Sequence, residues 1–101
     1  MKATNLRWMR CKASNGQFEN EVAVSGTEHD GEPFSMFADR KFVESSCLLS
    51  DEEQVEALLQ VEEIAREGQL VMVRLPGQTL ANGHTITVDA DSFASPVCHE
   101  V

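Results

Sequence analysis

The chain has few basic residues and few aromatic ones. Its 101 residues include eight Lys and Arg against seventeen Asp and Glu, which gives a formal net charge of −9. Proteins hold nucleic-acid backbones by placing lysine and arginine against phosphates, so this balance opposes a nucleic-acid partner. One tryptophan, five phenylalanines and no tyrosine are present. We expect the core to need these rings, which leaves few to stack against bases.

Targeting signals and long apolar runs are also lacking. No run approaches the roughly 20 apolar residues of a membrane-spanning helix, and residues 1–5 lead into a mixed polar segment without a signal-peptide core. We therefore expect a cytoplasmic protein without a membrane partner. The apolar fraction of 42% is ordinary for one small globular domain. We place that domain over residues 1–95 and a frayed tail over residues 96–101, because Ser95-Pro96 ends regular pairing.

The three cysteines, Cys11, Cys47 and Cys98, are an odd and widely spaced set without a C-x-x-C pair. Secreted domains of this size more often carry an even disulfide framework, so the count favours a reducing compartment. With His99 the cysteines supply the residue types of a Cys₃His zinc site. Zinc ligands usually come in pairs two to four residues apart, and that spacing is missing here. We therefore expect no metal and no other cofactor.

Recognised catalytic motifs are absent. The sequence has no G-x-S-x-G, no P-loop and no G-x-G-x-x-G. Cys11 or Cys47, with His84 and Asp89, offers the residue types of a nucleophile, a base and an orienting group. Nothing in their spacing favours that combination over chance, so we expect a protein that is not an enzyme.

The densest β signal lies in residues 70–75, Leu-Val-Met-Val-Arg-Leu. This nearly apolar run favours a central strand covered on both faces. Pro76-Gly77 fits the middle of a type II turn. Asn82-Gly83 is a two-residue hairpin signal that leads into the alternating residues 84–88, and type I′ geometry there requires a positive φ at Gly83.

Residues 6–13 and 18–25 are predicted to form a hairpin through Asn15-Gly16. A two-residue type I′ turn gives Gly16 a positive φ and fixes the register. Opposite charges and apolar residues then face one another in the pairs Lys12–Glu19, Arg10–Glu21, Met9–Val22 and Ala13–Phe18. Asp30-Gly31 joins residues 18–25 to a third strand over residues 33–39, with Val24 against Phe37 and Glu21 against Arg40. A bulge at Gly26 is the alternative that would shift this second register.

Residues 50–68 fit two structures. In the first, Ser50 and Glu53 form a capping box, a helix follows with apolar residues on one side, and Gly68 ends it. In the second, the helix ends near Leu58 and residues 59–65 form a strand, hairpinned through residues 66–68 onto residues 70–75. The longer helix is favoured, because Leu59, Val61 and Ile64 do not alternate strictly.

These elements predict a mostly β fold of the α+β class, in β-β-β-α-β-β order with one helix. We expect a five- or six-stranded antiparallel sheet, or a partly open barrel of the OB or SH3 kind. The element order resembles that of the OB fold. A resemblance of element order does not give a function.

The predicted registers place Trp8 on the same side of the sheet as Phe34 and Met36. Such an apolar patch with a charged rim has the composition of a protein-binding surface, and its candidate residues are Trp8, Arg10, Glu21, Phe34, Met36 and Arg40. The alternative is that the helix or the N-terminal segment covers this face. The acidic run of the predicted helix is either its wet face or a docking face for a basic partner, and it comprises Asp51, Glu52, Glu53, Glu56, Glu62, Glu63 and Glu67.

The sequence therefore predicts a small acidic domain, not an enzyme, that acts through contact with another protein or with itself as a homodimer. The alternative is an OB-like binder of a small molecule or of single-stranded nucleic acid. A third hypothesis is a thiol or metal site built from Cys11, Cys47, Cys98 and His99.

Overall fold

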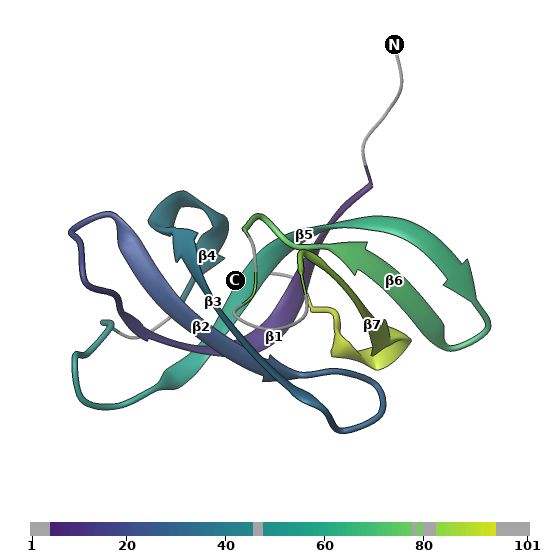
Figure 1. Ribbon diagram of the computed structural model, residues 1–101, viewed down its shortest axis with the longest axis horizontal. Coiled ribbons are helices and arrows are strands. Elements are labelled where there is room, and N and C mark those ends of the chain that lie inside the picture. Colours follow the sequence, from purple (N-terminus) through teal and green to yellow (C-terminus); the bar gives the residue numbers. More distant parts are fainter. Residues whose placement is uncertain (1–4, 46–47, 78, 80–82, 95–101) are drawn as a thin grey trace, which may run out of the picture.

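The protein is an antiparallel, curled sheet. The computed structural model describes residues 5–45, 48–77, 79 and 83–94. Its elements are β1 (Leu6–Asn15), β2 (Glu21–Thr27), β3 (Pro33–Asp39), the 3₁₀ turn η1 (Arg40–Phe42), β4 (Val43–Glu44), β5 (Val55–Glu67), β6 (Leu70–Arg74), β7 (Thr85–Asp89) and the 3₁₀ turn η2 (Ala90–Ser92). The strand order is β3-β2-β1-β5-β6-β7, with β4 also paired to β5. Figure 1 shows the sheet curled into a half-barrel, which confirms the mostly β prediction.

The prediction of a helix over residues 50–68 is wrong. The alternative, in which residues 59–65 form a strand paired with residues 70–75, is correct in kind. Residues 55–67 form β5, in which Ala57, Leu59 and Val61 are buried at every second position. Ile64 falls out of this alternation because the pairing with β6 shifts between Glu63 and Ala65. A bulge inserts one unpaired residue, and this extra residue made the strand look irregular in sequence.

Ser50 forms the local contacts expected of a helix cap, although no helix follows it in the described chain. Its Oγ accepts hydrogen bonds from the backbone N–H groups of Glu52 at 3.0 Å and Glu53 at 3.4 Å. Serine makes the same bonds in turns that lead into extended chain. The cap signal was real, but pairing of β5 with β1 and β6 decided the conformation of the residues after it.

The predicted register of the first hairpin is also wrong. β1 pairs with β2 through Lys12↔Ser25 to Asn15↔Val22, so a loop of residues 16–20 replaces the two-residue turn. Gly16 has no positive φ. It is needed for another reason, because a Cβ atom there would lie 2.8 Å from Cγ and 2.9 Å from the carbonyl oxygen of Glu21.

The predicted partners of β1 change as well, because only its last four residues pair with β2. Arg10 and Met9 lie across from Leu58 and Leu59 of β5. The ammonium group of Lys12 contacts the Glu56 carboxylate at 3.4 Å. The four predicted pairs with β2 therefore do not form.

The second hairpin forms with a register one residue from the predicted one. Val24 lies across from Met36, and Glu21 lies across from Asp39. A shift of one residue exchanges the two faces of a strand. It turns Phe34, Met36 and Ala38 into the core and leaves Phe37 outside, 41% exposed. Gly31, with φ 88°, lies in the turn.

The strand over residues 70–75 is central in the sheet, as predicted, but it is covered on one face only. β6 pairs with β5 and β7; Val71 and Val73 are buried, whereas Leu70 and Met72 are 38% and 40% exposed. Gly77 lacks the positive φ of a type II turn. It allows β3 to approach, since a Cβ atom there would lie 2.9 Å from the Phe37 carbonyl oxygen.

The last predicted strand is correct. Residues 85–89 form β7 with alternating burial, and Gly83 has the predicted positive φ of 74°. Asn82, the other half of that turn signal, and the tail predicted over residues 96–101 lie outside the described residues.

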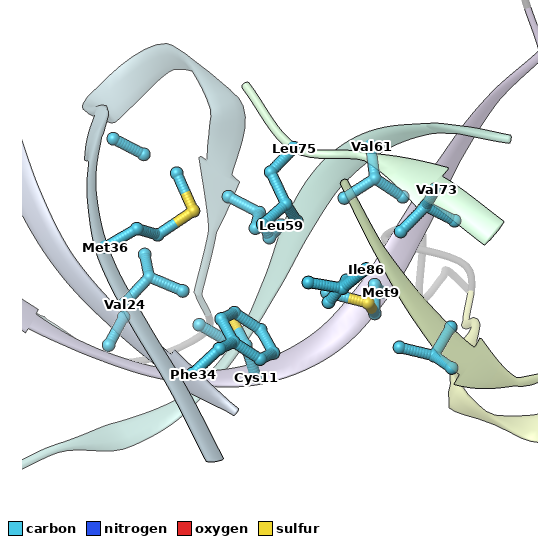
Figure 2. Packing of buried hydrophobic residues seen from close by; sticks show 14 of the residues in the cluster. Met9, Cys11, Val24, Phe34, Met36, Leu59, Val61, Val73, Leu75 and Ile86 are labelled. Carbon is cyan, nitrogen blue, oxygen red and sulfur yellow. The ribbon is translucent and has the colours of Figure 1, made fainter. Parts of the chain in front are cut away.

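One core joins both halves of the curled sheet. Figure 2 shows Met36 and Phe34 of β3 with Cys11 and Met9 of β1, Leu59 of β5 and Ile86 of β7 around the same interior. The chain after η2 returns to β1, where Phe93 bridges to Met9 and the Ala94 N–H donates to the Trp8 carbonyl oxygen at 2.9 Å. The described chain therefore begins and ends beside the same strand.

Two matched leucine substitutions test the assignment of β5 and β6. Leu59 is fully buried and Leu70 is 38% exposed. Leu59→Ala is expected to lower the free energy of unfolding by about 2–5 kcal/mol, because it removes buried methyl groups and leaves a cavity. Leu70→Ala serves as the control and should cost less than about 1 kcal/mol. Chemical denaturation of both variants measures the difference, and equal losses would contradict the assignment.

Candidate functional site

The six residues of the predicted contact surface do not form one patch. Phe34 and Met36 are 4% and 1% exposed and belong to the core, so their placement on the surface is wrong. Arg10 and Arg40 are exposed, while Trp8 and Glu21 are half-buried. The part that Trp8 plays in binding stays a prediction.

The other four residues form two separate groups. Trp8 and Arg10 lie on β1 beside η2 and the residues after it, and the Arg10 guanidinium donates to the carbonyl oxygen of Asp91 in η2. Glu21 and Arg40 lie at the other group, beside the loop between β1 and β2. The Arg40 guanidinium donates to the Glu19 carbonyl oxygen at 3.2 Å and to Asn15 Oδ1 at 3.2 Å.

The thiol hypothesis gains no support from Cys11. Its side chain is buried in the core, and burial, assisted by the Glu56 charge, raises the pKa of the thiol to about 12. A thiol needs to be deprotonated to act as a nucleophile or metal ligand. Among the described residues no three His, Cys, Asp or Glu side chains form a group that could hold a metal ion. Cys47, Cys98 and His99 lie outside those residues.

A hollow that sequence reasoning missed lies at one end of the β2–β3 hairpin. It has a volume of about 380 Å³. In Figure 1 the start of β2 and the end of β3 lie on the opposite side of the view from the β5–β6 turn. Its lining, here called the Phe18–Phe37 hollow, comprises Phe18, Glu19, Asn20, Glu21, Phe37, Ala38 and Asp39.

Two phenylalanine side chains of the hollow are in contact with solvent. Phe18, in the loop after β1, is 71% exposed, and Phe37, on the outer face of β3, is 41% exposed. Phe37 lies across from Ala23, whose methyl group is too small to cover a ring. Clustered exposed aromatic side chains are typical of surfaces that bind another molecule.

The hollow also carries three carboxylates, from Glu19, Glu21 and Asp39. Glu21 Oε1 accepts hydrogen bonds from the backbone N–H groups of Gln17 at 2.9 Å and Phe18 at 3.3 Å. Asp39 Oδ1 accepts one from the Lys41 N–H at 3.0 Å. In the part of the chain that the structure describes, the ion pairs are Arg7–Glu63, Lys12–Glu56, Arg66–Glu63 and Arg74–Glu62. None of them includes a carboxylate of the hollow.

Glu21 and Asp39 are direct cross-strand neighbours. Like charges placed directly opposite each other on a sheet are destabilising. The two residues that follow Asp39 are basic but engage other groups: Arg40 as described above, and Lys41 with its ammonium 5.3 Å from the centre of the Phe42 ring. The arrangement leaves negative charge beside two exposed rings, which is what a cation with an apolar body requires.

A second hollow, of about 590 Å³, lies on the outer face of β5, β6 and β7. It is lined by His29, Ala65, Arg66, Glu67, Leu70, Met72 and Thr87. Its charged residues include one of each sign, and the Arg66 guanidinium already contacts Glu63 at 3.3 Å. This hollow therefore shows no charge preference for a partner.

The Glu63 side chain is at the centre of a polar cluster near the end of the described chain. It contacts Arg7 at 2.6 Å and Arg66 at 3.3 Å, and the Arg7 guanidinium lies 4.2 Å from the centre of the Phe93 ring. The hydrogen bond from Arg66 lowers the pKa of the Glu63 carboxyl below its usual value, and the bond from Arg7 adds to this effect against the opposing effect of burial. The cluster ties β1 and β5 to the chain after η2, which is a structural role.

Comparison with protein-family models, with curated proteins and with solved structures finds no match to this chain. Within the described residues no helix is long and apolar enough to cross a membrane.

Glu63→Gln tests the polar cluster through pH. A carboxyl whose pKa is lowered by folding stabilises the native state above its unfolded pKa of about 4.3, and that contribution disappears as pH falls through the folded value. The wild-type protein should therefore be more stable than the variant at pH 7. The difference should shrink as pH falls below about 4. Denaturation curves across this range measure it, and a difference independent of pH would contradict the prediction.

Asp39→Asn tests the unpaired charges of the hollow. Asparagine keeps a side-chain oxygen for the Lys41 N–H but removes the like charge opposite Glu21, so we expect stability to rise by about 0.2–1 kcal/mol. Asp30→Asn is a matched control, because Asp30 Oδ1 accepts the Glu32 N–H at 3.0 Å in the same manner. Thermal melts of both variants at low salt separate the local effect from the shared change in net charge. A loss of stability in Asp39→Asn alone would show that its charge is not in conflict with Glu21.

Proposed function

We propose that this protein is a binding domain, not an enzyme, and that it holds a basic segment of another protein in the Phe18–Phe37 hollow. One observation carries the proposal: two exposed phenylalanine rings adjoin three carboxylates that form no ion pair in the described chain. Aromatic side chains provide much of the binding energy at protein interfaces. Unpaired carboxylates select the sign of charge on the partner.

The overall charge supports the same partner. A chain of net charge −9 attracts a basic protein over distances longer than contact, which raises the rate of encounter at low salt. A second copy of this chain would bring the same negative charge to the hollow, so a basic partner is favoured over a homodimer. Nucleic acid is disfavoured for the same reason, because the carboxylates of the hollow repel phosphate groups.

Burial of the exposed Phe37 ring would also favour the contact. Burying apolar surface stabilises a complex by about 25 cal/mol per Å², although loss of translational and rotational freedom offsets much of it. Phe37 is held on β3, within a paired sheet, so little further ordering of its backbone is needed on binding. Phe18 lies in the loop after β1 and lines the same hollow.

Two peptides of equal length and equal leucine content test the proposal, one with alternating Lys and Arg and the other with Glu at those positions. In a titration followed by backbone amide NMR shifts, the basic peptide should perturb residues 17–21 and 37–39, and the acidic peptide should not. Phe37→Ser should weaken binding about tenfold or more, equivalent to about 1.4 kcal/mol.

Met72→Ser is the matched control, because Met72 is 40% exposed on β6, away from the hollow, and Phe37 is 41% exposed. Its affinity for the basic peptide should equal that of the wild-type chain. The proposal is overturned if the basic peptide causes no shifts at millimolar concentration, or if its shifts map to the outer face of β6 and respond to Met72→Ser instead.

A further inference from the structure

We infer that the group recognised in the Phe18–Phe37 hollow is an arginine side chain, whose guanidinium bridges Glu21 and Asp39 while its plane stacks on the Phe37 ring. The inference rests on the proposed function and names the partner chemistry of the same hollow. Three features of the described residues support it: the placement of the two carboxylates, the position of the Phe37 ring, and the contacts that Arg40 and Lys41 make with other groups.

The residues that carry the two carboxylates lie directly opposite each other on neighbouring strands. Directly opposite residues of an antiparallel pair have Cβ atoms about 4.5–5.5 Å apart, and Glu21 and Asp39 are such a pair. In each, one oxygen accepts backbone N–H groups, and the hydrogen bonds of the described residues leave the second oxygen, Oε2 or Oδ2, for another donor. A ligand that satisfies both must donate in two directions at once.

Arginine meets that requirement better than lysine does. The guanidinium has five N–H donors in a rigid planar fork, so it can donate to two carboxylates together. An ammonium is a compact and strongly hydrated charge that gains less from a second acceptor placed to one side. One cation placed between Glu21 and Asp39 would relieve their like-charge opposition.

The Phe37 ring lies on the same face of the sheet as Asp39, where a planar cation bound to the carboxylates can stack on it. Phe37 is two residues before Asp39 on β3, so both side chains project from the same face of the sheet. The residue opposite Phe37 is Ala23, which leaves the ring accessible from the β2 side. Guanidinium groups stack on aromatic faces more readily than ammonium groups do.

The protein's own cations do not fill the hollow. Arg40 donates to Glu19 O and Asn15 Oδ1, and the Lys41 ammonium lies over the Phe42 ring. A volume of about 380 Å³ is near the small end of the usual range for ligand pockets, about 300–1,000 Å³. It suits one long side chain and its immediate neighbours.

Three peptides that differ at one central residue test the inference. The residue is arginine, lysine or citrulline, which keeps the shape of arginine without its charge. Isothermal or NMR titration of the wild-type chain should show the arginine peptide binding about tenfold tighter than the lysine peptide, with no measurable binding of the citrulline peptide. Shifts should centre on residues 21 and 37–39.

Two protein variants complete the experiment. Asp39→Asn should weaken the arginine peptide about tenfold and remove its advantage over the lysine peptide, whereas Asp30→Asn, with the same charge change at the other hairpin end, should bind as the wild type does. Equal binding of the arginine and lysine peptides at the hollow overturns the arginine inference and leaves the proposed function in place. Absence of binding by either basic peptide overturns both.

Discussion

The ladder between β1 and β5 is the interaction on which the rest of the structure depends. It runs from Leu6↔Glu62 to Ala13↔Val55 and joins the β1-β2-β3 meander to the β5-β6-β7 meander. Its partners lie far apart in sequence, so closing this contact costs loop entropy that local hairpins do not. Along the other edge of β1, its last four residues, Lys12 to Asn15, pair with β2, and Phe93 bridges to Met9. The register of β1 with β2 sets the position of that hairpin loop and of the hollow beside it.

Sequence reasoning could identify most strands because their alternation is local. The strands predicted over residues 33–39, 70–75 and 84–88 match β3, β6 and β7 to within one residue at each end. It failed where a distant partner decided the conformation. Ile64 is the extra residue where the pairing with β6 shifts, and it breaks the apolar alternation of β5, so the sequence favoured a helix there. Ser50 makes the contacts of a helix cap without a helix directly after it. Asn15-Gly16 has the composition of a tight turn, yet its glycine is there to admit Glu21.

The candidate site could not be predicted from the sequence because it depends on the register of one hairpin. A shift of one residue in the pairing of β2 with β3 decides whether Phe37 is outside and Met36 inside, or the reverse. The same shift decides whether Glu21 opposes Asp39 or Arg40. Of the six proposed contact residues, Glu21 lines the hollow and Arg40 lies beside it. The one available signal was the run Phe18-Glu19-Asn20-Glu21, in which an aromatic and two acids follow a glycine.

The contact between Gly16 and Glu21 makes two parts of the site inseparable. The absent Cβ of Gly16 leaves room for the Glu21 side chain, whose carboxylate in turn holds the backbone of Phe18. Any larger residue at Gly16 would move a ring and a carboxylate together. A substitution at Gly16 therefore changes the loop's apolar and ionic contributions at the same time. On the β3 side, Phe37 and Asp39 each have their own position on a paired strand, so they are free of this coupling.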